Sequence, residues 1–404
     1  MKVLLAHNYY GSTAPSGENQ VFEAEGNLLR QRNHEVHEFL RHSDSIRAKG
    51  IRGAVQGALS TPWNPFSANK IRQSVENTRP DVVHVHNTFP LLSPSIFHSI
   101  SHRAARVLTL HNYRLFCPAA IPMRAGRVCT DCIDNHSVWP SLQHGCYRNS
   151  RLATIPLAAN VALHRNLGTW AKQVDAFIAL TEFQRERMIA AGLPANLVHV
   201  KPNFYPGEPV MLPWTERQDN VVFVGRLTAE KGVVALVKAW FLWGSLAPEL
   251  RIVGDGGLRV ELEQLAAASP QVRIRFVGQL SGTAAQQEIA RARLLVLPSE
   301  SFETFGLVIL EAFASGTPAA VSNIGPLPFI VHPGENGVVF EPANPQSLLN
   351  AVRSVWEKNG ELERLAKGAR RSYEMLYNED ANYRMLMAIY EQAMEVSRRR
   401  RDAK

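Results

Sequence analysis

Two glutamates, Glu303 and Glu311, flank seven residues at a predicted junction between a strand and a helix. The apolar run at 293–298 predicts the strand, and the helical spacing of apolar residues over 305–314 predicts the helix. Glu303 then lies in the loop and Glu311 about two turns into the helix, while Gly306 suits a backbone that a ligand approaches closely. Carboxylates accept hydrogen bonds from hydroxyl groups, so this junction predicts a site for a sugar or a ribose.

The stretch 298–318 resembles the E-x7-E motif of the retaining GT-B glycosyltransferases of family 4. The resemblance implies that Glu303 contacts the hydroxyl groups of the donor sugar and that Glu311 contacts the ribose of the nucleotide. It also places three neighbouring residues in the donor site, namely Phe305, Gly306 and Leu307. The residues alone allow a plainer interpretation, in which two surface glutamates are favoured by the dipole near a helix N-terminus.

Two cations, Arg226 and Lys231, follow the predicted strand at 221–225, and a helix is predicted to begin beside Lys231. A guanidinium, an ammonium and free backbone N–H groups around one point suit a diphosphate, whose oxygens gain charge as it leaves. The pattern G-R-x-x-x-x-K-G resembles the diphosphate site of the same family, so both residues are predicted phosphate ligands. A solvated basic loop is the alternative.

His111 follows another predicted strand, in the segment 109–118. This segment resembles the "TLHD" segment of family 4, in which the histidine reaches the donor sugar, so we expect His111 to orient a sugar hydroxyl. Asn112 stands where the family often has an aspartate, which weakens any carboxylate role there. The alternative is a histidine whose hydrogen bonds are made entirely within a core loop and which contacts no ligand. His84 and His86 resemble the family's "D-V-V-H-x-H" strand and are predicted to support the site.

Three more loops complete the predicted donor site by resemblance. Gly17 corresponds to the glycine-rich loop after the first strand, Gly254 to a "V-G-x-G" turn, and Leu280 to the base-contacting loop. Each of these loops alone could be a plain turn between a strand and a helix.

All four cysteines fall within one predicted insert, residues 113–150, as Cys117, Cys129, Cys132 and Cys146. The C-x-x-C pair and the clustering favour a structural zinc site in a cytoplasmic protein, with disulfide or redox chemistry and unligated thiols as alternatives. Some family 4 enzymes look similar here, and the insert could shape the acceptor pocket. There is no D-x-D sequence, so we expect no catalytic metal, with cationic side chains taking that role.

The bulk properties are those of a soluble globular protein of 404 residues. We expect a cytoplasmic location, because no apolar run is long enough for a membrane span and no signal peptide is evident. The formal charge of +8 favours anionic partners. The basic tail 397–404 is either a solvated helix end or a contact for acidic lipid headgroups, which would make the protein peripheral at the inner face of the membrane. The sequence has no repeated pattern of lysines and arginines interleaved with aromatic residues, so we expect no binding to nucleic acid.

Apolar strand patterns alternate with helical patterns along nearly the whole chain, which predicts an α/β protein with parallel sheets. Twelve strands are predicted, at 2–6, 35–40, 81–86, 106–110, 176–180, 199–202, 221–225, 250–253, 272–277, 294–297, 319–322 and 338–341. The proline-rich stretch 204–220 is the natural linker. The segment 45–67 lacks clear periodicity and is predicted either to be mobile or to line an acceptor entrance.

The resemblance implies the GT-B fold, two Rossmann-like domains facing across a cleft. Residues 1–205 form the predicted acceptor-binding domain and 206–379 the donor-binding domain, while the helix 380–404 crosses back to the first. The implied activity is transfer of a sugar from a UDP- or GDP-sugar to a glycan or lipid-linked acceptor with retention, in which the departing diphosphate can accept the acceptor's proton. The alternatives are a sugar-nucleotide epimerase or hydrolase, and a non-catalytic sugar-nucleotide binder or scaffold.

Overall fold

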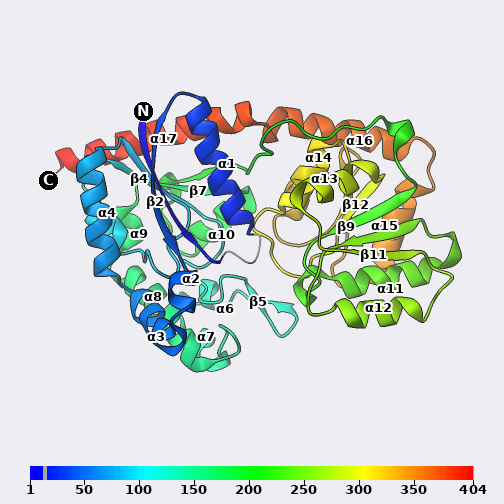
Figure 1. The fold of residues 1–404 in the computed structure, drawn as a ribbon, viewed down its shortest axis with the longest axis horizontal. Helices are drawn as coiled ribbons and strands as arrows, with labels where there is room; N and C mark the ends of the chain where they lie inside the picture. The colour runs from blue at the N-terminus through cyan, green and yellow to red at the C-terminus, as the bar shows by residue number, and fades with distance from the viewer. Residues whose placement is uncertain (12–15, 404) are drawn as a thin grey trace. The chain divides into compact units, whose positions relative to one another are not determined.

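The computed structural model describes residues 1–11 and 16–403, and the chain divides into two compact units (Figure 1). Unit 1 comprises Met1–Pro122, Cys129–Pro202 and Asn382–Lys404, and unit 2 comprises Met123–Val128 and Asn203–Ala381. The predicted boundaries, after residue 205 and before residue 380, lie close to these divisions.

Unit 1 is built on a parallel six-stranded sheet whose strand order is β2-β1-β3-β4-β7-β8. Its strands are β1 (Lys2–Tyr9), β2 (Glu35–His42), β3 (Val82–Val85), β4 (Ala105–Thr109), β7 (Ala176–Ala179) and β8 (Val198–Val200). The central strands β3, β4 and β7 are buried along their whole length, as expected for a parallel sheet covered on both faces. A short hairpin within the cysteine-containing insert, β5 (Met123–Arg124) with β6 (Arg127–Val128), groups with unit 2.

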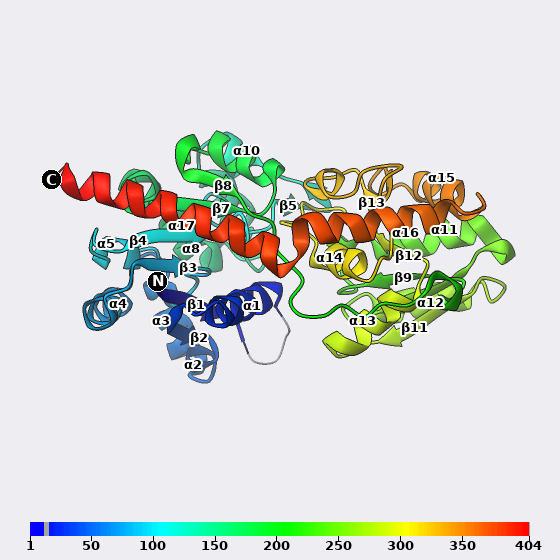
Figure 2. The same cartoon turned by 90° about the horizontal axis from the view of Figure 1, so that it is seen from above.

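Eleven α-helices accompany this sheet within the described residues. They are α1 (Gly17–Gln31), α2 (Asp44–Arg47), α3 (Gly50–Ser60), α4 (Pro65–Thr78), α5 (Ile96–Ser99), α6 (Asp131–Asp134), α7 (Trp139–His144), α8 (Arg151–Asn166), α9 (Thr169–Gln173), α10 (Glu182–Ala190) and α17 (Glu379–Asp402). Helices α1 and α17 pack on one face of the sheet, where Phe22 and Tyr390 join the same apolar core as Val3 and Val107. Figure 2 shows α17 running along this unit.

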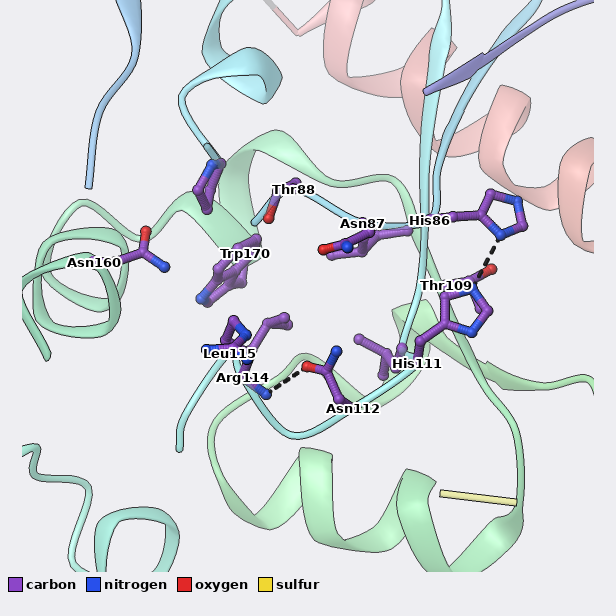
Figure 3. Close-up of a pocket in the computed structure, with 13 residues that line it drawn as sticks. His86, Asn87, Thr88, Thr109, His111, Asn112, Arg114, Leu115, Asn160 and Trp170 are labelled. Atoms are coloured by element: carbon purple, nitrogen blue, oxygen red, sulfur yellow. Dashed lines mark hydrogen bonds between the residues drawn. The ribbon is translucent and has the colours of Figure 1, made fainter. Parts of the chain in front are cut away.

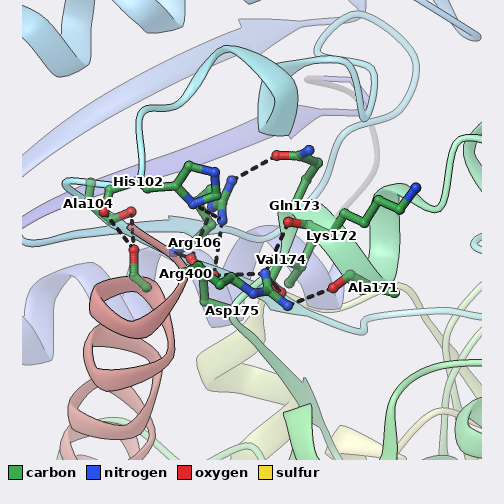
Figure 4. A network of polar contacts seen from close by, with 10 residues as sticks. His102, Ala104, Arg106, Ala171, Lys172, Gln173, Val174, Asp175 and Arg400 are labelled. Atoms are coloured by element: carbon green, nitrogen blue, oxygen red, sulfur yellow. Dashed lines mark hydrogen bonds and ion pairs between the residues drawn. The ribbon is translucent and has the colours of Figure 1, made fainter. Parts of the chain in front are cut away.

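The end of α17 is anchored to unit 1 by a buried ionic network (Figure 4). Arg400 donates to Asp175 at 2.9 Å, and Arg106 donates to the same carboxylate at 3.0 Å. The Ser397 hydroxyl donates to the backbone oxygen of His102. The predicted return of the C-terminal helix to the first unit is therefore confirmed. The basic tail is helical to Asp402, with Arg399 and Arg401 exposed and Arg400 engaged with Asp175, so it forms a largely solvated helix end.

Unit 2 repeats the architecture, with strand order β11-β10-β9-β12-β13-β14 and all pairs parallel. The strands are β9 (Asn220–Val224), β10 (Glu249–Val253), β11 (Ile274–Gly278), β12 (Leu294–Leu297), β13 (Ala319–Ser322) and β14 (Gly337–Phe340). Its helices are α11 (Val233–Trp243), α12 (Arg259–Ala267), α13 (Gly282–Arg291), α14 (Leu307–Ala314), α15 (Pro345–Trp356) and α16 (Glu361–Ser372). Trp240 and Leu365 fill a core between the sheet and its helices.

Each of the twelve predicted strands is present, but some of the predicted helices differ. The segment 45–67, which shows no clear periodicity in the sequence, forms α2, α3 and the start of α4. Asn64 caps α4 by accepting from two backbone N–H groups, with Pro65 at the first helical position. The helical patterns of the sequence also predict helices over 152–170 and 94–103. The first divides at Gly168, whose backbone is left-handed, and the second is shortened to α5. None of the described helices is both long and apolar enough to cross a membrane.

Candidate functional site

The predicted donor-site residues of unit 2 meet at one edge of its sheet. Arg226 follows β9, Gly254 follows β10, Leu280 follows β11 and Glu303 follows β12. These four strands are neighbours and parallel, so their carboxyl ends lie side by side. The chain order reverses between β9 and β12, and ligands of open α/β sheets bind at such a point.

Lys231 and Glu303 form an ion pair that spans β9 and β12. The Lys231 Nζ lies 2.6 Å from Glu303 Oε1, and the Ser299 hydroxyl donates to the same oxygen at 2.6 Å. Burial would raise the pKa of Glu303, but the charge and hydrogen bond of Lys231 hold it below its usual value. Glu303 is therefore an ionised acceptor at neutral pH. Lys231, the predicted ligand of the phosphate, and Glu303, the predicted ligand of the sugar, are thus paired with each other.

Arg226 is the more available cation at this edge. Its guanidinium is exposed and donates to Glu230, four residues along, at 3.2 Å. Exposed pairs of this kind contribute little to stability, so a diphosphate could recruit Arg226 at small cost. The structure brings Arg226 and Lys231 to the same loop, as the spacing predicts.

Glu311 lies on α14, one turn from its start rather than two, because the helix begins at Leu307 and not at Phe305. Its carboxylate forms no hydrogen bond or ion pair with any part of the chain that the structure describes. Burial raises the pKa of Glu311 to about 7. An unpartnered carboxyl group that is half-protonated near neutral pH is a good acceptor for a ligand hydroxyl.

The other predicted donor residues differ in their backbone conformation and in how far they are buried. Gly306 has a φ of +88° and caps α14, so a left-handed backbone there requires glycine. At Gly254 the backbone conformation and packing both require glycine, because φ is +136° and an added Cβ would lie 1.9 Å from the oxygen of Gly225. Phe305 is buried with its ring near Tyr377, and its place in the donor site stays a prediction. Leu280 and Leu307 are partly exposed.

A separate pocket in unit 1 lies at the carboxyl ends of β3 and β4 (Figure 3). Its lining is mostly polar and includes His86, Asn87, His111, Asn112, Arg114 and Asn160. Imidazole, amide and guanidinium groups of this kind suit a ligand rich in hydroxyl groups. The structure therefore places the predicted His111 in a pocket, together with one of its two predicted supporting histidines.

Behind this pocket lies a buried polar cluster centred on Glu25. The Lys201 ammonium donates to Glu25 Oε2 at 2.8 Å, and the other oxygen lies 3.0 Å from His84 Nδ1 and 3.3 Å from His86 Nε2. Burial would raise the pKa of Glu25, but Lys201 and both histidines hold it well below its usual value. The ligand atoms of Glu25, His84 and His86 are close enough to hold a metal ion, but Lys201 already supplies a cation to this carboxylate.

The charge of Glu25 favours one arrangement of protons on His86 and His111, although Glu25 Oε1 and His86 Nε2, 3.3 Å apart, do not have hydrogen-bond geometry. An ionised Glu25 can only accept, so it favours the tautomer of His86 with its proton on Nε2. His86 Nδ1 is then an acceptor for His111 Nε2, which lies 3.0 Å away. Burial, with His86 as neighbour, holds the pKa of His111 well below its usual value, so this histidine is neutral. His111 consequently keeps an unprotonated Nδ1 that can accept a hydrogen bond.

Glu18 is a site candidate that the sequence reasoning missed. Asn112 donates to Glu18 Oε1 at 2.7 Å, and burial raises the pKa of Glu18 to about 7. Family 4 often has an aspartate at the position of Asn112. In this chain the carboxylate beside that position comes instead from Glu18 on α1. Gly17, predicted to approach the donor phosphates, is the exposed first residue of α1. Part of its predicted loop, residues 12–15, lies outside the described residues.

The four cysteines form no disulfide. Cys132 lies near enough to the other three for their charges to interact. However, within residues 1–11 and 16–403 no three of these sulfur atoms reach the mutual spacing of ligands to one metal ion. The structure thus does not assemble a closed zinc site, and zinc stays a prediction that metal analysis of the purified protein would test.

Two units that each carry a parallel sheet with side chains for a ligand at its carboxyl edge define the GT-B class of proteins. Comparison with known families agrees: "Glycosyltransferase Family 4" matches residues 16–206, and "Glycosyl transferases group 1" matches residues 209–372. Together the two matches span most of the chain. The chain belongs to family 4 of the GT-B glycosyltransferases.

Individual relatives match smaller parts of the chain. An uncharacterized glycosyltransferase of Methanocaldococcus jannaschii is 33% identical over 178 residues, which cover 44% of this chain and 45% of the relative. The sulfoquinovosyl transferase of Arabidopsis thaliana is 30% identical over 223 residues, covering 54% of this chain and 38% of the relative. The chain thus matches less than half the length of these curated relatives.

Solved structures share the fold over nearly the whole chain. A glycosyltransferase from Rickettsia africae has a TM-score of 0.68 at 14% identity, covering 97% of this chain and 99% of its own. Anabaena HepE in complex with UDP has a TM-score of 0.63 at 18% identity, covering 97% and 100%. The predicted GT-B fold is confirmed.

Proposed function

We propose that the protein is a glycosyltransferase that moves a sugar from a nucleotide-sugar to a glycan or lipid-linked acceptor, in polysaccharide or glycoconjugate biosynthesis. The observation that carries the proposal is the carboxyl edge of the second sheet. There Lys231 and Glu303 are paired, Arg226 is exposed beside them, and Glu311 has no hydrogen-bond or ion-pair partner among residues 1–11 and 16–403. Cations for a diphosphate and carboxylates for sugar and ribose hydroxyl groups thus share one edge.

The residues have separable roles in the proposed donor complex. Arg226 and Lys231 stabilise the charge that develops on the departing diphosphate, in place of a metal ion. Glu303, released in part from Lys231, accepts hydrogen bonds from the sugar, and Glu311 accepts from the ribose. A UDP- or GDP-sugar fits this arrangement, and UDP is supported by the complexes of HepE with UDP and with UDP-glucose.

The pocket of unit 1 is the proposed place of the acceptor, with His111 at its wall. His111 offers a neutral nitrogen that accepts a hydrogen bond, and its proposed role is the one that the resemblance implies, to orient a hydroxyl group of the donor sugar beside the acceptor. Retention of configuration completes the proposal. In that mechanism the acceptor oxygen bonds to the anomeric carbon on the face that the diphosphate leaves, and a phosphate oxygen takes the acceptor's proton. We also propose a cytoplasmic location, at the inner face of the membrane.

Calorimetric titration of UDP, GDP and ADP tests the donor site. One nucleotide should bind, and Arg226→Ala and Glu311→Ala should each weaken binding by about 1.5–3 kcal/mol, as for lost hydrogen bonds to charged groups. Arg353→Ala is a matched control, because Arg353 pairs with Glu357 four residues along just as Arg226 pairs with Glu230. It should leave binding unchanged.

The alternatives predict different outcomes in the next assay, which incubates the matching nucleotide-sugar with and without acceptors. Rapid release of free sugar or conversion of the donor without an acceptor would identify a hydrolase or an epimerase. Tight binding with no turnover under any condition would identify a binding protein or scaffold. If no nucleotide binds to the folded protein, the donor-site proposal is wrong.

A further inference from the structure

Helix α3 buries its small residues and exposes its large apolar ones, which is the reverse of an ordinary amphipathic surface helix. Its glycine face is the buried one, since a Cβ at Gly53 would lie 1.7 Å from the Ile46 oxygen and one at Gly57 would lie 2.9 Å from the Ile46 side chain. The large apolar side chains at a spacing of four residues are exposed instead, by 85% for Ile51 and 73% for Leu59, with Val55 between them. A surface helix normally buries such a row.

The helices next to α3 add to this apolar surface. Helix α3 packs against α8, and α7 packs against α8, so the three lie together at one end of unit 1 (Figure 1). Trp139 on α7 and Leu152 and Ile155 on α8 are exposed, Leu152 by 80%. We call the six exposed side chains the apolar patch: Ile51, Val55, Leu59, Trp139, Leu152 and Ile155. Exposed apolar groups on helices that pack together in this way point to an interaction surface.

The sequence stretches that carry the apolar patch are rich in positive charge, and the nearest carboxylates lie on the neighbouring helices α2 (Asp44) and α6 (Asp131 and Asp134). The two stretches that carry it, residues 45–75 and 135–174, contain nine lysines and arginines and no aspartate or glutamate. The whole chain has an excess of eight positive charges, so these two stretches account for all of it. Seven of these cations are exposed and form no ion pair among the described residues; four of the seven, Lys49, Arg52, Arg148 and Arg151, lie on or directly beside α3, α7 and α8.

We propose that this surface docks the protein on an anionic lipid bilayer, with α3 lying in the interface. Apolar side chains on one face with cations beside them fit the boundary between acyl chains and acidic headgroups. A partner chosen for charge alone would not need six exposed apolar side chains. The other basic candidate, the C-terminal tail, is weaker as a docking element because Arg400 is committed to Asp175.

Flotation of the full-length protein with vesicles tests the proposal, independently of any catalytic activity. The vesicles are phosphatidylcholine alone or with about one third phosphatidylglycerol. We expect binding to the anionic vesicles that weakens as salt is raised. The variant Ile51→Ser/Val55→Ser/Leu59→Ser should lower the vesicle-bound to free ratio at least about tenfold. Arg52→Gln/Arg151→Gln should lower it most at low salt.

A matched control removes apolar side chains of similar exposure elsewhere. Leu246 and Val260 in unit 2 are 84% and 65% exposed, and Leu246→Ser/Val260→Ser should bind vesicles as the native chain does. Nucleotide affinity and melting temperature should stay unchanged in all these variants, which separates failure of docking from failure of the donor site.

Three outcomes would overturn the proposal. The patch variant could bind anionic vesicles as well as the native chain does. Loss of binding could follow only from Arg398→Gln/Arg399→Gln/Arg401→Gln, which would assign the contact to the tail. Sedimentation could show self-association that depends on the apolar patch without any vesicle binding, which would make the partner a second copy of this chain.

Discussion

The ammonium of Lys231 and the carboxylate of Glu303 lie 2.6 Å apart at the carboxyl edge of the second sheet. Their positions in the sequence are 72 residues apart, and they follow the two strands between which the chain order reverses. One side chain is the proposed ligand of the diphosphate and the other of the sugar. The ion pair means that the two ligand roles are coupled, because each group partly neutralises the other before the donor binds.

The first prediction concerns Glu303→Gln. The amide keeps the size of the side chain but removes the charge that neutralises Lys231, so the ammonium is more available to a phosphate group. We expect UDP or the matching nucleotide to bind several-fold more tightly, while kcat for sugar transfer falls by at least about 100-fold because a charged contact made in the transition state is lost. Calorimetry and steady-state kinetics measure both changes.

Glu357→Gln controls for a general gain of positive charge, because Glu357 neutralises Arg353 on α15, away from this edge. It should change neither quantity. If Glu303→Gln weakens nucleotide binding, the carboxylate does not compete with phosphate for Lys231.

The second prediction concerns pH and Glu311. Burial raises the pKa of its carboxyl group to about 7, so the group is protonated below that pH and ionised above it. The ionised form is the better acceptor for ribose hydroxyl groups. Nucleotide affinity should therefore rise from pH 6 to pH 8, and binding at pH 7 should release a fraction of a proton. Titrations in buffers of different ionisation enthalpy measure that release.

The Glu311→Gln variant separates this effect from titration of the phosphate itself. Its affinity should be lower at pH 8, and the part of the pH dependence that belongs to Glu311 should vanish. Equal proton release by the native chain and the variant would show that Glu311 takes no part in nucleotide binding.

The third prediction is about stability. Glu25→Gln leaves the buried Lys201 ammonium without its counter-charge, which costs on the order of 3–5 kcal/mol. The double variant Glu25→Gln/Lys201→Met should recover much of this loss, because no unpaired charge remains. The pKa of Glu25 is depressed in the folded state, so its contribution is present at neutral pH and is lost as pH falls through the folded value.

Urea unfolding at pH 7 measures these differences. Glu35→Gln is the control, because Glu35 pairs with Lys2 at the surface and such pairs contribute about 0–1 kcal/mol. A cost for Glu25→Gln no larger than that of the control would mean that the Lys201 ammonium finds another partner.

The strands and the loop residues of the donor site could be predicted because their signals are local. Buried parallel strands read as short apolar runs, and Arg226, Lys231 and Glu303 follow such runs directly. Helix α3 could not be predicted from the sequence, because its glycines lower helix propensity and its row of large apolar side chains is exposed. The pair of Glu25 with Lys201 joins residues 176 positions apart, and Glu18 reaches Asn112 from another element. Spacing in the sequence carries no signal for such contacts.

The fourth prediction separates a packing role of Gly254 from a ligand role. Gly254 has a φ of +136°, and a Cβ there would lie 1.9 Å from the backbone oxygen of Gly225. Gly254→Ala should lower the free energy of unfolding by about 2–4 kcal/mol, through backbone strain and overpacking combined. Gly257→Ala, in the same turn with nothing within 4 Å of an added Cβ, should stay within about 0.5 kcal/mol of the native chain.

Nucleotide binding decides between the two roles of Gly254. Below the melting temperature of Gly254→Ala, affinity should equal that of the native chain if the glycine serves only the contact between the ends of β9 and β10. Because the methyl group would push on the Gly225 oxygen, next to Arg226, a loss of affinity without further unfolding would instead show that the backbone of this turn positions the phosphate site. Calorimetry at two temperatures below the transition, with Gly257→Ala in parallel, distinguishes these results.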